Sequence, residues 1–186
     1  PAAKALVVEG EKACEAAREL LSALGVKPSA VVVVAWPGGG KAVAKVDWSP
    51  LAGRDVYLWP DDDQKPYPEN HPKAGELMPE QDQPGYQAMM AVAQAVRETA
   101  TTIKMIKPPE GVPDGWDLAD EFPLGFDLTA HIRTSAFPVA FPDTKKDVVP
   151  PAPVSVAEPE TKGEASKKLP TSIDDEEYAD EQAVLN

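Results

Sequence analysis

The stretch Ala5-Leu6-Val7-Val8-Glu9-Gly10 decides the fold, because a short apolar run containing β-branched residues gives way at its end to a helical pattern. Across residues 11–24 the apolar side chains recur at steps of three and four residues. Gly25 then supplies a stop signal for the helix. The sequence therefore predicts a strand, a tight turn and a helix.

Further strands and helices alternate along the chain. Residues 31–35 are apolar throughout, which predicts a strand that is covered on both faces, as in a parallel sheet between helices. Strands are also predicted at 55–59 and 103–106, and a helix at 86–100. This alternation predicts an open α/β fold with a mainly parallel central sheet flanked by helices, and functional residues at the carboxyl ends of the strands.

Composition divides the chain near residue 142. Residues 143–186 carry 11 acids, 5 bases and 5 prolines but no Phe or Trp, so they bury too little apolar surface to offset chain entropy. We expect one domain over 1–142, followed by a disordered, Pro-rich acidic linker over 143–186. A Pro-rich insertion at 64–84 lengthens the domain between a strand and a helix, either as a lid over a site or as a loop that extends outward.

The overall composition excludes several classes of protein. The 186 residues carry a net charge of −13, which argues against gripping nucleic acid through a basic surface alone. A single cysteine, Cys14, forms neither a disulfide framework nor a cysteine-rich zinc site, and it is expected to be a small core residue. The longest apolar run, residues 30–36, is far shorter than the ~20 residues of a membrane span. We expect a soluble, cytoplasmic protein without membrane contact.

Carboxylates follow the predicted strands. Glu9 lies at the end of the first strand and Asp61-Asp62-Asp63 follow the third, so the acids converge if these strands are neighbours. In an extended segment, Asp61 and Asp63 project to one side and the aspartate between them to the other. Such a cluster either raises a pKa or binds a cation, and oxygen ligands suit Mg²⁺ or Mn²⁺. Asp117 and Asp120, which come after the fourth strand, could extend the same rim.

Several of these motifs together resemble the toprim domain of phage- and plasmid-type DNA primases. Residues 7–13 (VVEGEKA) are similar to its opening motif, and residues 47–63 (DWSPLAGRDVYLWPDDD) to its middle. Gly85 with the helix after it, and residues 115–120 (GWDLAD), are similar to its downstream landmarks. The resemblance covers about residues 5–125 and implies a Rossmann-like toprim fold.

The resemblance also implies a function in DNA replication. Glu9, Asp61 and Asp63 become candidate catalytic residues, with Glu9 as the general acid/base. The same three carboxylates become candidate ligands of Mg²⁺ or Mn²⁺, and Asp117 and Asp120 are weaker matches to a third acidic site. A primase of this kind joins ribonucleoside triphosphates into primers on a single-stranded DNA template, next to a replicative helicase module. We therefore expect the chain to be a fragment of a larger primase-helicase. The cysteine-rich zinc module usual in such primases has no counterpart in this chain.

Candidate phosphate contacts are Gly10, Lys12 and Lys41. Lys12 lies in the first helical turn after Glu9, close enough to the acidic rim to touch a phosphate. The glycine-rich loop that ends at Lys41 lacks the spacing of a nucleotide-hydrolysing P-loop, because an alanine follows the lysine. We expect this loop to contact nucleotide or template backbone instead.

Two alternatives to a primase stay open. One is a toprim-family nuclease, in which water replaces the primer 3′-hydroxyl at the same metal site. The other is a non-catalytic toprim module that docks a helicase. A receiver-like phosphoacceptor fits less well, since it needs a lone aspartate at its strand end and the sequence has three in a row at 61–63.

Overall fold

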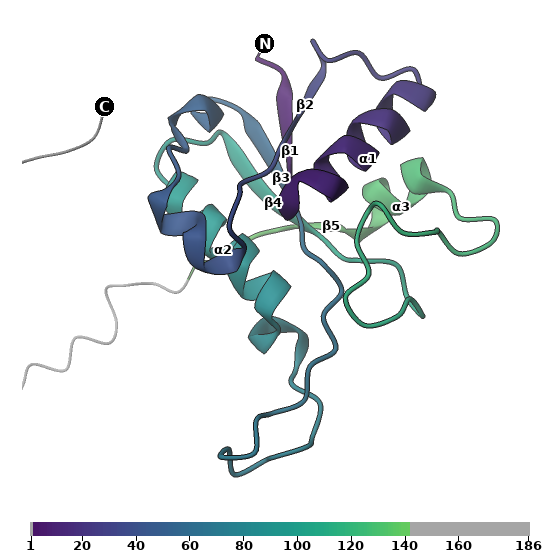
Figure 1. Cartoon of the computed structure of the whole chain (residues 1–186). Coiled ribbons are helices and arrows are strands. Elements are labelled where there is room, and N and C mark those ends of the chain that lie inside the picture. Colours follow the sequence, from purple (N-terminus) through teal and green to yellow (C-terminus); the bar gives the residue numbers. More distant parts are fainter. Residues whose placement is uncertain (1, 142–186) are drawn as a thin grey trace, which may run out of the picture. The chain divides into compact units, whose positions relative to one another are not determined.

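The computed structural model describes residues 2–141. The acidic linker predicted over 143–186 lies outside the described residues. Within them, one sheet with helices on both of its faces forms an α/β fold (Figure 1). None of the helices in this part of the chain is long and apolar enough to cross a membrane.

The sheet has five strands in the order β2-β1-β3-β4-β5. The strands are β1 (Lys4–Val8), β2 (Val31–Val34), β3 (Asp55–Trp59), β4 (Thr102–Ile106) and β5 (Ala136–Pro138). The first four are parallel, as predicted, and β5 joins β4 in the antiparallel sense. Because β1 and β3 are neighbours, with Val8 paired to Trp59, the chain leaves both strands at the same edge of the sheet.

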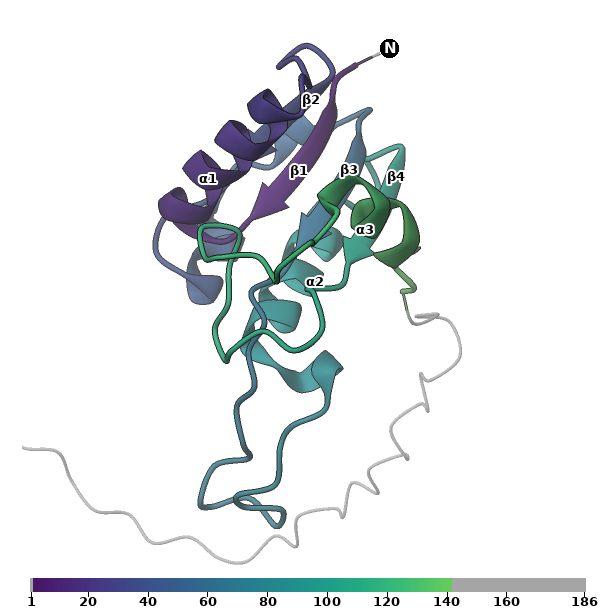
Figure 2. The same ribbon diagram turned by 90° about the vertical axis from the view of Figure 1, so that its right-hand side faces the viewer.

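Helices cover the two faces (Figures 1 and 2). The α-helices are α1 (Gly10–Ala23), α2 (Pro84–Val96) and α3 (Leu128–Ser135), and the short 3-10 helices are η1 (Gly40–Lys45), η2 (Ser49–Leu51) and η3 (Glu80–Asp82). One apolar core lies between the sheet and α2, where Val7 and Leu58 pack with Met89. The other lies on the side of α1 and α3, where Val8 and Trp59 pack. Successive strand residues therefore alternate between two cores, as the period of a strand requires.

The expectation that residues 31–35 form a strand covered on both faces is wrong in part. β2 is an edge strand that pairs with β1, and only Val33 of its four valines is buried. A continuous valine run is equally compatible with an edge position, because its backbone pairing does not depend on how far the side chains are covered. Cys14 is buried in the core on the side of α1, as expected.

Residues 64–84 form an arm that projects from the domain (Figures 1 and 2). Its two sides are joined by backbone hydrogen bonds, from Tyr67 N–H to Glu76 O over 2.8 Å and from Met78 N–H to Lys65 O over 3.0 Å. The side chain of Gln83, only 5% exposed, closes the base of the arm with hydrogen bonds to Lys65 and Met78. The insertion therefore extends outward, and its base is the part that lies next to the acidic segment at 61–63.

Candidate functional site

Glu9 connects β1 directly to α1. It takes the position just before the first helical residue, with φ −80° and ψ 131°. Gly10 then adopts a φ of 71°, which residues with a Cβ rarely adopt. A Cβ at Gly10 would meet nothing within 4 Å, so the tight turn and not a lack of space requires the glycine. This turn holds the Glu9 carboxyl at the carboxyl edge of the sheet.

Asp61 leaves β3 at the same edge and hydrogen-bonds through its side chain to Glu9. Burial, and then the negative charges of Glu9, Asp117 and Asp63, raise the pKa of Asp61 to about 8. Burial and the charge of Asp63 also raise the pKa of Glu9. A carboxyl pair of this kind titrates as a unit, so without a cation Glu9 and Asp61 share a proton near neutral pH.

Asp63 binds the first turn of α2. Its Oδ2 accepts a hydrogen bond from Gly85 N–H over 2.7 Å, and its Oδ1 lies 3.7 Å from Lys65 Nζ. The first N–H groups of a helix have no partner inside it, and the helix dipole favours a carboxylate there. Gly85 approaches so closely that a Cβ would lie 2.7 Å from the backbone oxygen of Asp61. The acidic segment is therefore fixed against the start of α2.

Asp62 contacts a different part of the chain. Its N–H donates to Trp116 O over 2.9 Å, its carbonyl accepts from Gly115 N–H over 2.8 Å, and its carboxylate accepts from Gln64 over 2.8 Å. This isolated antiparallel bridge brings the following Asp117 next to Asp61. The segment is not extended as predicted, because the N–H of residue 63 donates to the carbonyl of residue 61 over 3.0 Å, which makes a three-residue turn.

Asp117 and Asp120 form a turn against Lys12 at the start of α1. Asp120 accepts from Asp117 N–H over 3.0 Å, and Lys12 Nζ lies 3.5 Å from Asp120 and 3.9 Å from Asp117. That backbone hydrogen bond, and then the charge of Lys12, lower the pKa of Asp120. Lys12 thus lies at the acidic rim, as expected. Asp117 adds charge to the carboxyl pair, whereas Asp120 is held ionised within its own turn.

The glycine-rich loop borders the acids from the side of α2. A Cβ on Gly40 would lie 3.2 Å from the Ala88 side chain and 3.9 Å from Glu9 Oε1, so the loop passes close to both. The side chain of Lys41 lies outside the described part of the structure. The nucleotide contacts expected of Lys41, Lys12 and Gly10 stay predictions.

A cavity of about 410 Å³ opens beside the acidic segment. Its walls come from residues 60–64, from the base of the arm and from the loop at 107–111, with Tyr86 of α2 between them. The volume falls in the range typical of small-molecule sites. Lys107 lies in the wall and forms an ion pair with Glu80 at 3.5 Å.

The oxygen atoms of the acidic side chains are suitable ligands for a hard cation, but their arrangement in this structure does not form a complete binding site. Across residues 2–141, no group of three or more His, Cys, Asp or Glu side chains is placed so that it could hold a metal ion. The Glu9–Asp61 pair is nonetheless all-oxygen and half-buried, and it is surrounded by the charges of Asp63 and Asp117. A divalent cation would replace the proton that the pair shares. The metal-binding and catalytic roles of these residues stay predictions.

Sequence reasoning missed two residues that shape the site. Lys65 lies between Asp63 and Asp114, 2.7 Å from the latter, and places a positive charge behind the acidic segment. Its place in the sequence, two residues after three aspartates, could have indicated that it lies near them. Gln83 gave no signal, since its partners Lys65 and Met78 depend on how the arm folds back.

No protein-family model, curated protein or solved structure matches the chain. The fold and the site therefore define a class by geometry alone. It is an α/β domain in which neighbouring parallel strands bring two carboxyl groups into contact at their carboxyl edge.

Proposed function

We propose that the chain is the toprim catalytic domain of a DNA primase that makes short RNA primers on a single-stranded DNA template. The observation that supports this most is the Glu9–Asp61 contact, which joins the carboxyl ends of adjacent parallel strands at a place where burial and neighbouring negative charges raise the pKa of both groups. Ribonucleoside triphosphates as substrates and a replicative helicase module as partner are part of the same proposal. The resemblance of residues 7–13, 47–63 and 115–120 to toprim primases adds to it.

The residues have distinct roles in this proposal. Glu9, whose pKa is raised, accepts the proton of the primer 3′-hydroxyl. Asp61, with Asp63 and Asp117 beside it, holds Mg²⁺ or Mn²⁺, which when bound activates the hydroxyl and neutralises charge on the triphosphate. Asp63 keeps the acidic segment in place through Gly85. Lys12, 69% exposed, is free to turn from Asp120 towards a phosphate.

Template-directed dinucleotide synthesis tests the proposal. The full-length protein is given single-stranded DNA, ribonucleoside triphosphates and Mg²⁺, and the products are separated by length. Glu9→Gln and Asp61→Asn should lower synthesis by at least about a hundredfold, the usual scale for losing a general base or a metal ligand. Glu19→Gln, an exposed carboxylate on α1, is the matched control and should leave synthesis unchanged.

Two results would contradict a primase. Unchanged synthesis in Asp61→Asn would remove the acidic pair from the reaction. Nicking of plasmid DNA without nucleoside triphosphates, lost in the same variant, would assign the site to a nuclease, in which water attacks instead of the 3′-hydroxyl.

A further inference from the structure

A second cavity, also of about 410 Å³, is lined by Leu21 of α1, by Ile132 and Arg133 of α3 and by strand residues of the sheet. Its lining runs from Lys4 and Val31, the first residues of their strands, to Ile106, the last residue of β4, and includes none of the acids of the candidate site. We call it the basic groove. Its apolar floor is formed by Leu6, Leu21, Val31, Ile106, Ile132 and Ala136.

Cations surround this floor. Lys4, Lys104 and Arg133 line the groove, and none of the described residues that line it is acidic, although the chain carries a net charge of −13. The ammonium groups of Lys4 and Lys104 lie 5.5 Å and 5.7 Å from the centre of the Tyr57 ring, so both cations are held at the groove. An apolar floor with a cationic rim fits an apolar side chain flanked by carboxylates.

The loop before α3 carries such a side chain. Leu124 is completely exposed, at 107%, and is the most exposed large apolar residue in the described part of the chain. Glu121 and Asp127 lie three residues to either side of it. Phe126 N–H donates to Pro123 O over 3.0 Å, which closes a turn with the leucine at its second position.

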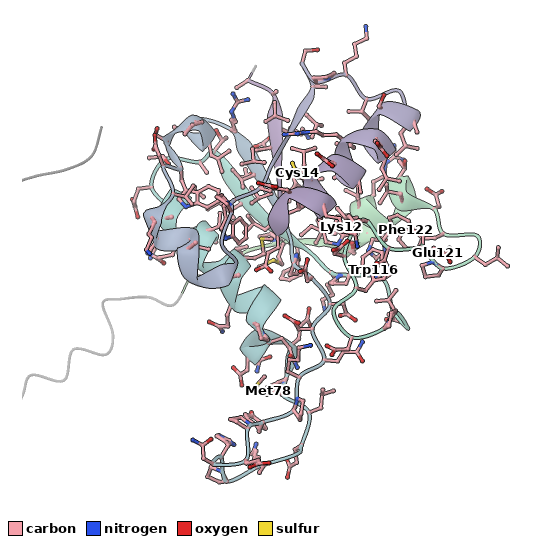
Figure 3. All side chains as sticks on the ribbon, in the orientation of Figure 1. Lys12, Cys14, Met78, Trp116, Glu121 and Phe122 are labelled. Carbon is pink, nitrogen blue, oxygen red and sulfur yellow. The ribbon has the colours of Figure 1, made fainter. Side chains whose placement is uncertain are left out.

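The turn is held in place by aromatic contacts. Gly125 has a φ of 77°, as the third position of a type II turn requires. Phe122 stacks on Phe126 with ring centres 5.1 Å apart, and it contacts the buried Trp116 edge-on at 5.3 Å (Figure 3). A leucine on a fixed turn loses little conformational freedom on binding, which favours association.

We propose that Leu124 of one copy of the chain docks into the basic groove of a second copy. The leucine fills the apolar floor, and the carboxylates of Glu121 and Asp127 complement Lys4, Lys104 and Arg133. The turn leads directly into α3, which supplies one wall of the groove, so a two-fold arrangement allows each copy to give and to receive the same contact. The contact is small and charged, and therefore weak and sensitive to salt.

Sedimentation of the full-length protein, at concentrations up to about 1 mM, tests the proposal. We expect a reversible dimer that weakens as salt is added. Leu124→Ser should weaken dimerisation at least about tenfold, since burial of a leucine is worth that factor or more. Leu77→Ser, a leucine 63% exposed on the arm, is the matched control and should dimerise like the wild type.

A mixing experiment shows whether the turn and the groove are the two halves of one contact. The double variant Lys104→Glu/Arg133→Glu, like Leu124→Ser, should dimerise at least about tenfold more weakly than the wild type. Mixed together, they should form a 1:1 complex more readily than either variant dimerises alone, because one intact turn meets one intact groove. Thermal unfolding of each variant checks that both fold like the wild type.

Several outcomes would overturn the proposal. A wild type that stays monomeric throughout the concentration range contradicts it, as does a dimer that Leu124→Ser leaves unchanged. Binding of a single-stranded oligonucleotide that the double charge variant loses, with no dimer formed, would assign the groove to nucleic acid instead.

Discussion

Asp63 accepts a hydrogen bond from Gly85 N–H over 2.7 Å, and this contact ties the acidic segment after β3 to the first turn of α2. Two elements that the insertion at 64–84 separates in sequence are thereby joined at their bases. Because the two backbones are so close, position 85 has no room for a Cβ, although most helix positions accept one.

Gly85→Ala should destabilise the fold. The added Cβ would lie 2.7 Å from the backbone oxygen of Asp61, so the helix or the acidic segment has to move. We expect a loss of about 1–3 kcal/mol in the free energy of unfolding, the usual cost of overpacking. Urea denaturation measures it, with Gln94→Ala on the exposed face of α2 as the control. A stabilised Gly85→Ala protein would contradict the close approach, because alanine is otherwise the better helix former.

Stability without divalent cations should fall as the pH rises. Folding raises the pKa of Asp61 from 3.8 to about 8, so the folded chain binds more protons than the unfolded chain between these values. The contribution is complete at acid pH and is lost as the pH rises through that window. Urea denaturation in chelator between about pH 5 and pH 8 measures the slope. Asp61→Asn, which cannot ionise, should flatten it, and a wild-type stability that rises across the window would contradict the shared proton.

Mg²⁺ binding should release protons. A cation that takes the place of the proton between Glu9 and Asp61 displaces about one proton near neutral pH. Calorimetric titration in buffers of different ionisation enthalpy counts the protons released. Asp61→Asn should abolish both binding and release, while Glu19→Gln should preserve them. Binding without proton release would place the cation elsewhere on the chain.

Lys12→Ala should weaken triphosphate binding with little effect on folding. The side chain is 69% exposed, and exposed ion pairs contribute little to stability. If Lys12 contacts a phosphate, KM for ribonucleoside triphosphates should rise by about tenfold while the unfolding temperature stays close to the wild-type value. Lys27→Ala, another exposed lysine, is the control. An unchanged KM would contradict a phosphate contact and would indicate that Lys12 only pairs with the acids of the 117–120 turn.

Much of the sheet was predictable, because apolar runs and helical periodicity depend on local sequence. The strands at β1, β3 and β4 and the helices α1 and α2 follow directly from these patterns. β5 was missed because it has only three residues and ends in proline, so its existence depends on pairing with β4. The helix expected over 86–100 already ends at Val96.

The contact between Glu9 and Asp61 was predictable for a topological reason. Residues that follow neighbouring parallel strands meet at one edge, whatever the loops do. The partners of Asp63 and Asp120 were not predictable, because they depend on turns whose geometry the sequence does not specify. Carboxylates of similar sequence context thus ended in different surroundings, with the pKa raised in Asp61 and lowered in Asp120.

The hydrogen bond between Asp63 and Gly85 also couples movement of the acidic segment to movement of α2. A ligand that shifts the acidic segment by a fraction of an ångström should also shift α2, because the backbones of Asp61 and Gly85 are in close contact and Asp63 is hydrogen-bonded to Gly85. The buried face of that helix packs into the same core as Trp36 and Trp48, whose ring centres lie 5.8 Å apart in an edge-on arrangement. Ligand binding at the acidic segment should therefore change the fluorescence of these buried tryptophans, although the ligand does not contact them.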